Sequence, residues 1–465
     1  MHRDRIKIIQ KIHQKSRGKY ILYWMQSAQR IQYNHALNYA IKQANEKDLP
    51  VIVMFNIVPN YKEANLRHYT FMLEGIQFVQ KALEDKGIQF DICYGQITQS
   101  IGPYLKHADT LVLDRGYLKP QKQMRNDVYK LIKSNAYPVD IIQIETENLI
   151  PVEALYPKSA YGAYVIRPHV MKKMFDYMDY KIDETLINRT KIDITKSVDI
   201  TNIDTFLFKF EIDQTVKPYP KFKGGYSEAV KHLNVFLDNK LKQYDNRSDA
   251  SLHIQSYMSL YLQFGQISDQ DILNRLFDHK AYKANPQQSE QFIEQLITRR
   301  ALAYNFVTYN KDYDQFEHMT EKWAYDTMHA HKEDIRENIY AVDEIEDSKT
   351  HDKYFNAAMI EARITGFMAN YMRMYWAKKI MEWSSSMKDA YEIIVYLNNK
   401  YFIDGRNPNS YSNIAWNFGK HDRAWQERPI FGKIRYMNQQ GLLRKFDMDT
   451  YVLYVNKLLK SYSTF

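Results

Sequence analysis

The sequence is poor in residues that cross-link a chain or break its helices. Its 465 residues include one cysteine, Cys93, fifteen glycines and thirteen prolines. A single cysteine excludes an intramolecular disulfide and any metal or iron-sulfur site built on several cysteines, and it favours a reducing compartment. Because glycine and proline mark turns, their scarcity favours a largely helical protein with short loops.

Signals for membrane insertion and export are also missing. No apolar run approaches the roughly 18 residues of a membrane-spanning helix. Residues 1–19 are basic but have no apolar centre of the kind found in secretory signals. We therefore expect no membrane association and a cytoplasmic location. With 45% hydrophobic and 26% charged residues, the chain has enough apolar side chains for a large core.

The net charge of +9 is concentrated near the end of the chain. Residues 401–465 contain ten Lys or Arg and five Asp or Glu, and aromatic residues such as Trp416 and Trp425 stand among them. This composition is typical of a surface that meets phosphates and stacks on bases. Charge alone is also compatible with a solvated basic face.

The first third of the chain alternates short apolar runs with amphipathic stretches. Residues 20–25, 50–58, 88–94, 110–114 and 139–145 each have the pattern of a buried strand. Strands that alternate with helices predict a doubly wound α/β domain with a parallel sheet, which we assign to residues 1–182. There is no glycine-rich phosphate loop, so ordinary nucleotide enzymes are poorly supported.

The second half has helical periodicity almost throughout. Residues 228–241, 289–304, 356–382 and 386–400 repeat apolar side chains every three or four positions. Between the two halves, residues 183–223 are polar and irregular. The fold class is therefore α/β plus all-α, with a linker at 183–223 and a helical domain at 224–465.

Few side chains have the spacing of conventional catalysis. His421 and Asp422 lack a nearby nucleophile or further ligands, so neither a hydrolytic triad nor a metal site is predicted. Trp376 and Trp383 lie two helical turns apart and share a face. Such an aromatic stripe is compatible with core packing or with an electron path.

Several motifs in the same order resemble a known family. They are residues 370–383, 396–409 and 421–437, with residues 114–118, 146–153, 256–265 and 294–306 in support. Together they resemble the class II cyclobutane pyrimidine dimer photolyases, which are light-driven DNA repair flavoproteins. The resemblance implies an antenna domain followed by a helical domain that binds FAD, active as FADH⁻, and a flipped-out pyrimidine dimer in DNA as substrate. We expect a monomer.

The resemblance also assigns roles to individual residues. FAD would be bound by Ser256, Met258, Ser259, Asn370, Arg373 and Asp404, with Arg373 and Asp404 forming a salt bridge. The residues implied for the chemistry are Glu294 and Asn398, together with the tryptophans Trp376 and Trp383 that photoreduce the flavin. DNA and the dimer would be bound by Arg247, Met374 and Trp416.

Four positions depart from the family pattern. Phe355 replaces a tryptophan of the electron relay, for which Tyr354 or Tyr375 would have to substitute, and Ala301 replaces a glutamate near the substrate pocket. Leu260 and Gln426 also differ, without loss of a functional group. For Glu294, the residues alone indicate a surface ion pair with Arg299 as the alternative to a role at the dimer.

Two other functions remain open at this point. One is a cryptochrome-like flavin photoreceptor without repair activity, and the other is a nucleic-acid-binding protein without FAD. The sequence leaves open whether an antenna chromophore is present, and whether it is a folate or a deazaflavin.

Overall fold

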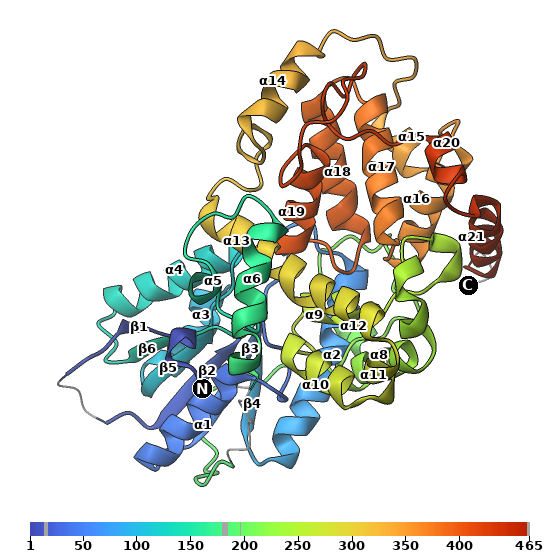
Figure 1. Cartoon of the computed structure of the whole chain (residues 1–465). Helices are drawn as coiled ribbons and strands as arrows, with labels where there is room; N and C mark the ends of the chain where they lie inside the picture. Colours follow the sequence, from blue (N-terminus) through green and yellow to red (C-terminus); the bar gives the residue numbers. More distant parts are fainter. Residues whose placement is uncertain (14–16, 179–184, 196, 463–465) are drawn as a thin grey trace.

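A computed structural model describes residues 1–13, 17–178, 185–195 and 197–462 (Figure 1). The first part of the chain forms a sheet flanked by helices, and the second part is helical. Similar two-part folds are found among solved structures, as described below. The fold class expected from the sequence is confirmed. The predicted boundary between residues 182 and 183 lies outside the described residues.

Among the described residues, six strands form one sheet in the order β1-β6-β5-β2-β3-β4. Their bounds are β1 Ile6–Gln10, β2 Tyr20–Met25, β3 Val51–Ile57, β4 Gln89–Tyr94, β5 Ala108–Asp114 and β6 Asp140–Ile144. Strands β2 to β6 pair in parallel, and β1 adds to β6 as an antiparallel edge. All five predicted strands are present, whereas β1 was not predicted.

Successive residues of each strand point to opposite faces of the sheet, and both faces are covered by helices. One face packs against α1 His35–Lys47 and α2 Leu66–Asp85. The other packs against α3 Ile97–Leu105 and α4 Lys119–Ser134. Burial on both faces explains the continuous apolar runs that identified these strands in the sequence.

The strand order reverses between β2 and β5, because the chain winds outward in both directions from this point. In open α/β sheets a crevice forms at such a switch point, outside the carboxyl ends of the strands, and ligands bind there. The fold therefore predicts a binding site next to the segments that follow β2 and β5.

The remaining helices follow β6 along the chain, and those from residue 226 onward build the second part of the molecule. They are α5 Val152–Leu155, α6 Ala163–Lys173, α7 Ile203–Leu207, α8 Tyr226–Val235, α9 Met258–Gln263, α10 Asp269–Asp278, α11 Lys280–Ala284, α12 Pro286–Ile293, α13 Arg300–Tyr309, α14 Lys322–Ala330, α15 Val342–Glu346, α16 Lys353–Thr365, α17 Asn370–Trp383, α18 Met387–Tyr401, α19 Pro408–Asn417, α20 Gln439–Leu443 and α21 Met448–Tyr462. None of the helices in the described part of the chain is long and apolar enough to cross a membrane.

The stretch 356–382 was predicted as one helical segment, but it forms the end of α16 and most of α17. Gly366 ends α16 in the left-handed conformation, with φ of 75°. A Cβ at this position would lie 2.7 Å from the side chain of Ile403. The break is therefore set by a tertiary contact with the loop after α18.

The two parts of the molecule meet at the start of α2 and the loop after α18. Arg67, which is almost completely buried, donates hydrogen bonds to the carbonyls of Ala362, Ile364 and Tyr401. Asn65 donates to the carbonyl of Lys400 at 2.6 Å. These contacts fix the loop that carries the predicted site residue Asp404 against the α/β part.

Candidate functional site

Arg373 and Asp404 form the ion pair that the resemblance implies. Arg373 lies in the second turn of α17, and Asp404 lies in the loop between α18 and α19. Nη1 donates to Oδ1 at 2.9 Å and Nη2 to Oδ2 at 3.2 Å, while Nε donates to the carbonyl of Met368. The guanidinium also lies 4.1 Å from the ring centre of Phe402. A planar cation is thus held in one orientation in a largely buried position.

Asn398 is buried in the last turn of α18, next to this loop. Its amide nitrogen donates to Oδ1 of Asn399 at 3.0 Å, and the same oxygen accepts the backbone N–H of Arg406. The chain packs so closely here that a Cβ at Gly405 would lie 2.8 Å from the carbonyl oxygen of Asn398. Asn399 therefore orients the Asn398 amide, whose oxygen remains available as an acceptor.

The predicted phosphate-binding residues lie at the start of α9. The hydroxyl of Ser256 accepts the backbone N–H of Met258 at 3.4 Å, and Ser259 is exposed. Tyr257 has a left-handed backbone, and its ring lies 4.9 Å from that of Phe367. Phe367 in turn lies 5.5 Å from the Arg373 guanidinium. This chain of contacts brings the start of α9 to the Arg373–Asp404 pair.

Trp376 is buried one turn after Arg373, and its ring lies 6.1 Å from that of Phe402. Its indole N–H has no hydrogen-bond partner among the described residues. Phe402 is therefore in contact with both the Arg373 guanidinium and Trp376. A buried donor without a partner beside a fixed cation is what a missing polar ligand would leave.

Trp383, at the other end of α17, is surrounded by other rings. Phe355 lies 5.0 Å away, His351 5.1 Å and Tyr340 5.5 Å between ring centres. The hydroxyl of Tyr340 is 2.6 Å from Nδ1 of His351. The sequence did not point to Tyr340, which lies in no motif that we singled out, and it assigned no role to His351, although His351 begins the segment that contains Phe355.

Glu294 begins a π-helical turn, Glu294–Arg299, between α12 and α13. Its carboxylate accepts hydrogen bonds from Arg167 at 2.8 and 3.0 Å and from Arg299 at 3.2 Å. Burial would raise the pKa of Glu294, but the hydrogen bonds and charge of Arg167 lower it overall. The alternative ion pair with Arg299 is therefore present, with Arg167 as a further partner that sequence analysis missed. A role at the dimer stays a prediction.

The residues predicted to contact DNA lie on several different elements. The Arg247 guanidinium hydrogen-bonds the side chain of Gln291 in α12, close to Glu294 in sequence. Trp416, in α19, is half-buried, and the Arg435 guanidinium lies 5.0 Å from its ring. Asp422 holds Arg435 in place at 2.9 and 3.1 Å. In the first turns of α17, Asn370 is exposed and Met374 is half-buried.

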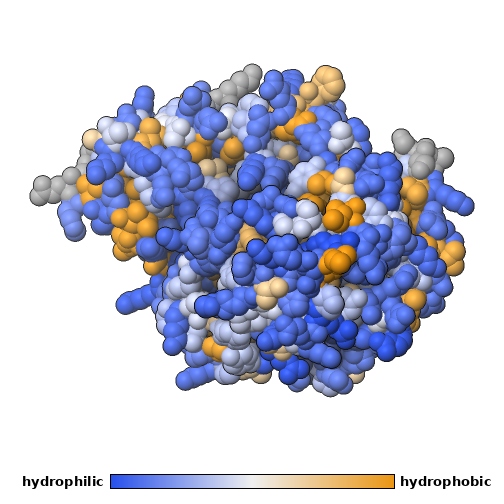
Figure 2. Space-filling model, turned by 90° about the horizontal axis from the view of Figure 1, so that it is seen from above, coloured by the Kyte–Doolittle hydropathy of each residue, from blue (hydrophilic) through white to orange (hydrophobic). Residues whose placement is uncertain are grey.

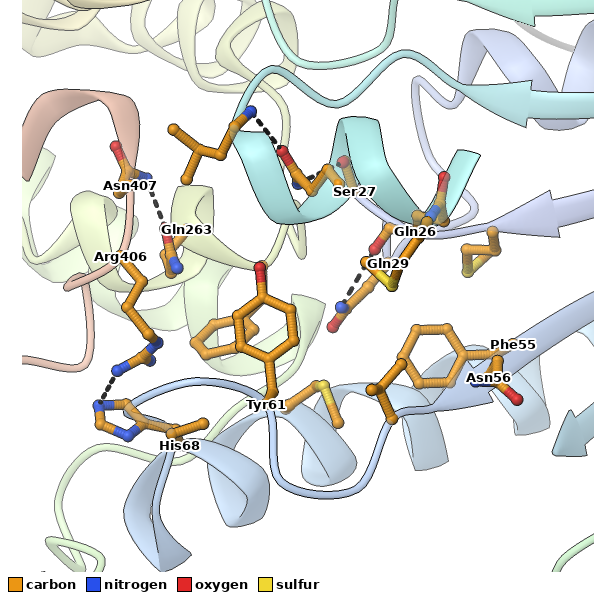
Figure 3. A pocket seen from close by; sticks show the side chains of 18 of the residues that line it. Gln26, Ser27, Gln29, Phe55, Asn56, Tyr61, His68, Gln263, Arg406 and Asn407 are labelled. Atoms are coloured by element: carbon orange, nitrogen blue, oxygen red, sulfur yellow. Dashed lines mark hydrogen bonds between the residues drawn. The ribbon is translucent and has the colours of Figure 1, made fainter. Parts of the chain in front are cut away.

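A separate cavity of about 1090 Å³, measured out to its open mouth, lies between the two parts of the molecule (Figure 3). Segments that follow β2, β5 and β6 form one wall, and Gln263 and residues 406–408 form another. Arg406 reaches His68 across the cavity edge at 3.2 Å, and Asn407 donates to Gln263 at 2.5 Å. The cavity is thus at the switch point that the strand order predicts.

Several residues that line this cavity have buried side-chain acceptors without a partner among the described residues. They are the side-chain oxygens Gln26 Oε1, Gln29 Oε1, Asn56 Oδ1 and Glu147 Oε1. Burial raises the pKa of Glu147 to about 7, and the neighbouring Glu145 acts in the same direction. Aromatic residues, among them Trp24, Phe55 and Tyr304, complete the lining. Such a cavity suits a flat aromatic ligand with several N–H or O–H donors.

Known proteins resemble this chain both in its first part and over nearly its whole length. Residues 21–183 match the family model described as DNA photolyase. In solved structures, the fold is shared with a class III photolyase from Agrobacterium tumefaciens, with a TM-score of 0.72, 17% identity and coverage of 95% of this chain and 87% of that one. It is also shared with a photolyase from Sulfolobus tokodaii, described with two FAD molecules and a novel light-harvesting cofactor, with a TM-score of 0.69, 16% identity and coverage of 93% and 89%.

Relatives in sequence extend over nearly the whole chain. The deoxyribodipyrimidine photo-lyase of Arabidopsis thaliana is 34% identical over 451 residues, covering 94% of this chain and 89% of that protein. The deoxyribodipyrimidine photo-lyase of Methanothermobacter thermautotrophicus is 38% identical over 453 residues, covering 97% of this chain and 98% of that protein. On this evidence the chain belongs to the DNA photolyase family.

Proposed function

We propose that this protein is a deoxyribodipyrimidine photo-lyase, a flavoprotein that uses light to split cyclobutane pyrimidine dimers in DNA. The observation that carries the proposal is the 38% identity to a protein of that name along 97% of the chain. The helical part supplies a fixed Arg373–Asp404 pair, an oriented Asn398 amide and an unpartnered indole N–H, which together fit a polar aromatic cofactor. A class II assignment is part of the proposal.

Arg373, Asp404, Asn398 and the start of α9 would hold FAD. The chemistry that FAD supplies, when bound in its reduced form and excited by light, is the transfer of one electron to the dimer and its recovery after the ring has opened. The protein's share is binding, orientation and electrostatics. The oxygen of Asn398 would accept a hydrogen bond from an N–H group of the cofactor, in the orientation that the bond from its amide nitrogen to Asn399 sets.

The dimer has to leave the duplex to reach this site, and its weakened pairing lowers the cost. Trp416 and Met374 would pack against the flipped bases, and Arg247 would bind a neighbouring phosphate. Glu294 carries a negative charge while Arg167 and Arg299 pair with it. In that state it can only accept a hydrogen bond, such as one from the imide N–H of a pyrimidine, so donation to a carbonyl requires prior uptake of a proton.

Repair of an ultraviolet-irradiated thymine oligomer tests the function directly. The purified protein, loaded with FAD and chemically reduced, should restore thymines under blue light and leave the dimer intact in the dark. A flavin spectrum without repair would favour a cryptochrome-like photoreceptor. A protein that binds DNA but takes up no FAD would overturn the proposal altogether.

We also propose that the cavity at the switch point holds a second, light-harvesting chromophore. Its unpartnered acceptors and aromatic walls support a flat heteroaromatic ring with several donors, a description that fits both a deazaflavin and the pterin of a folate. Adding each compound to the FAD-loaded protein should reveal a new absorption band for the one that binds. An excitation spectrum of repair that matches this band would show energy transfer, whereas an unchanged spectrum with both compounds would contradict the proposal.

The same proposal includes a monomer that acts in the cytoplasm. On the face shown in Figure 2, apolar residues form small separate patches within a mostly hydrophilic surface. Large contiguous apolar patches mark stable interfaces, so this face gives no support to a dimer. The molar mass measured by light scattering should be that of one chain, 55.5 kDa.

A further inference from the structure

Helix α6 has one face whose side chains are exposed along its length, and at the end of this face the ring of Phe175 lies 6.0 Å from that of Phe277. Tyr164 and Met171 are each 65% exposed, and Phe175, just beyond the helix, is 59% exposed. The exposed positions recur every three or four residues and therefore share a face: Tyr164, Arg167, Pro168, Met171, Lys172 and Phe175. We call these six residues the α6 face.

The segment that carries the α6 face is basic. Residues 154–175 contain four Lys or Arg and no Asp or Glu, although acidic residues make up 55 of the 465 in the whole chain. The basic residues stand beside aromatic side chains such as Tyr161 and Tyr164. This combination matches a polyanion with stackable bases, since lysine and arginine neutralise phosphates and aromatic rings stack on bases.

Contacts join the α6 face to the proposed substrate site. Arg167 pairs with Glu294 at 2.8 Å. The backbone carbonyl of Tyr161 is 2.7 Å from Nδ1 of His421. The hydroxyl of Tyr161 donates to the carbonyl of Asp422 at 3.1 Å. Asp422 in turn holds Arg435 against Trp416. The α6 face is thus continuous with both Glu294 and the segment that supports Trp416.

We propose that the α6 face binds the DNA that flanks the dimer on one side, so that the DNA-binding surface extends beyond the helical part onto α6. This inference rests on the proposed function. The eleven residues of α6 rise about 16 Å at 1.5 Å per residue. Since each strand of DNA advances about 3.4 Å per nucleotide, α6 spans at most about five nucleotides of the flank.

Binding to DNA of different arm lengths tests this proposal. The FAD-loaded protein, Lys172→Gln and Tyr164→Ala are titrated with duplexes that carry a central dimer and arms of about ten base pairs, twice the span of α6. Each variant should bind several-fold more weakly than the unaltered protein. Lys172→Gln should also reduce the slope of log affinity against log salt by about 0.9, because one phosphate contact is lost.

The weaker binding of the two variants should depend on the length of only one of the two duplex arms, the arm that lies on α6. When that arm is cut to about two base pairs, shorter than the span of α6, the unaltered protein and both variants should bind alike. Shortening the other arm should preserve the difference. Lys42→Gln is a matched control, because Lys42 is an exposed lysine on α1, which lies away from α6 in Figure 1. It should bind both duplexes as the unaltered protein does.

Three results would overturn the inference. In the first, the variants bind the long duplex as tightly as the unaltered protein does. In the second, the variants lose the same factor of DNA affinity with the long and the short arm. In the third, the variants lose self-association while their DNA affinity is unchanged. Light-driven repair by the unaltered protein distinguishes failure of this inference from failure of the proposed function. If repair occurs but the variants bind normally, only the role of the α6 face is wrong, whereas absence of repair would contradict the proposed function.

Discussion

Both terminal nitrogens of Arg373 donate to the carboxylate of Asp404, one to each oxygen, at 2.9 and 3.2 Å. The Asp404 side chain is 9% exposed and that of Arg373 23%. Removing either partner leaves the other charge uncompensated in a largely buried place, which typically costs about 3 to 5 kcal/mol. We expect Arg373→Ala and Asp404→Ala to retain much less FAD than the unaltered protein after dialysis, measured by absorption.

An exposed ion pair provides the control for this measurement. Lys81 and Asp85 pair at 2.8 Å on the surface of α2, with both side chains more than half exposed. Because such pairs contribute about 0 to 1 kcal/mol, Asp85→Ala should keep its flavin. An Asp404→Ala protein that is fully loaded and fully active would show that this pair does not lie at the cofactor.

Trp416 is the second residue to test. Replacing it with alanine removes one base-stacking surface, so affinity for dimer-containing DNA should fall by about 1 to 3 kcal/mol. FAD content should be normal, because the contact recorded for the Trp416 ring is with Arg435 rather than with Arg373 or Asp404. Fluorescence anisotropy with a labelled duplex gives the affinity. Loss of flavin in this variant would make Trp416 a structural residue.

The fold was predictable where burial leaves a pattern. Strands β2, β3, β5 and β6 are buried on both faces and β4 at its centre, so each appeared as an apolar run. Strand β1 lies at the edge, and all five of its residues are half-buried or exposed, so it has no such run. The break at Gly366 was equally hidden, because its neighbours Phe367 to Ala369 are apolar and continue the helical period.

The candidate site was predictable only in part. The family resemblance of the motifs identified Arg373, Asp404 and Asn398 as site residues. In the structure, Arg373 and Asp404 form an ion pair although they lie 31 positions apart in the chain. Arg167 belongs to none of these motifs, so its pairing with Glu294 depends on tertiary structure alone. The cavity residues Gln26 and Asn56 could have been predicted from the sequence, since both lie at the carboxyl end of a predicted strand, where ligands bind in open α/β sheets.

Glu361 gives the stability of the protein a dependence on pH. Burial raises the pKa of this carboxyl from 4.5 to about 7, and the Tyr451 hydroxyl, which donates to it at 2.5 Å, partly opposes the shift. The folded protein therefore binds more protons than the unfolded chain between these values. Stability due to Glu361 is fully present below pH 4.5 and is lost as the pH rises to about 7, by roughly 3 kcal/mol.

Glu361→Gln removes this titration while keeping an acceptor for Tyr451. Urea unfolding of both proteins, at the same FAD concentration, should show that the unaltered protein loses more stability than the variant between pH 5 and pH 7.5. Other titrating groups affect both proteins equally, so the difference isolates Glu361. Parallel pH profiles would mean that Glu361 is already ionised in the folded protein at pH 5.

Phe355 occupies the place where the family pattern has a tryptophan, and it is completely buried at 5.0 Å from Trp383. Phenylalanine is much harder to oxidise than tryptophan. If Trp376 and Trp383 are the ends of a relay interrupted at Phe355, photoreduction of bound oxidised FAD by an external thiol should be slow. Repair by the chemically reduced protein should be unaffected, since its electron does not pass through the relay.

Phe355→Trp should speed photoreduction, measured by transient absorption, at a stability cost of about 1 to 3 kcal/mol for the larger ring. Rapid formation of an aromatic radical in the unaltered protein would contradict the interrupted relay. A tyrosine would then carry the electron, and each candidate has a group beside it that can accept its proton: His351 for Tyr340, Asp449 for Tyr354 and Asp352 for Tyr375. Of these, Tyr340 contacts the Trp383 ring directly, so Tyr340→Phe should abolish the radical while Tyr354→Phe and Tyr375→Phe leave it in place.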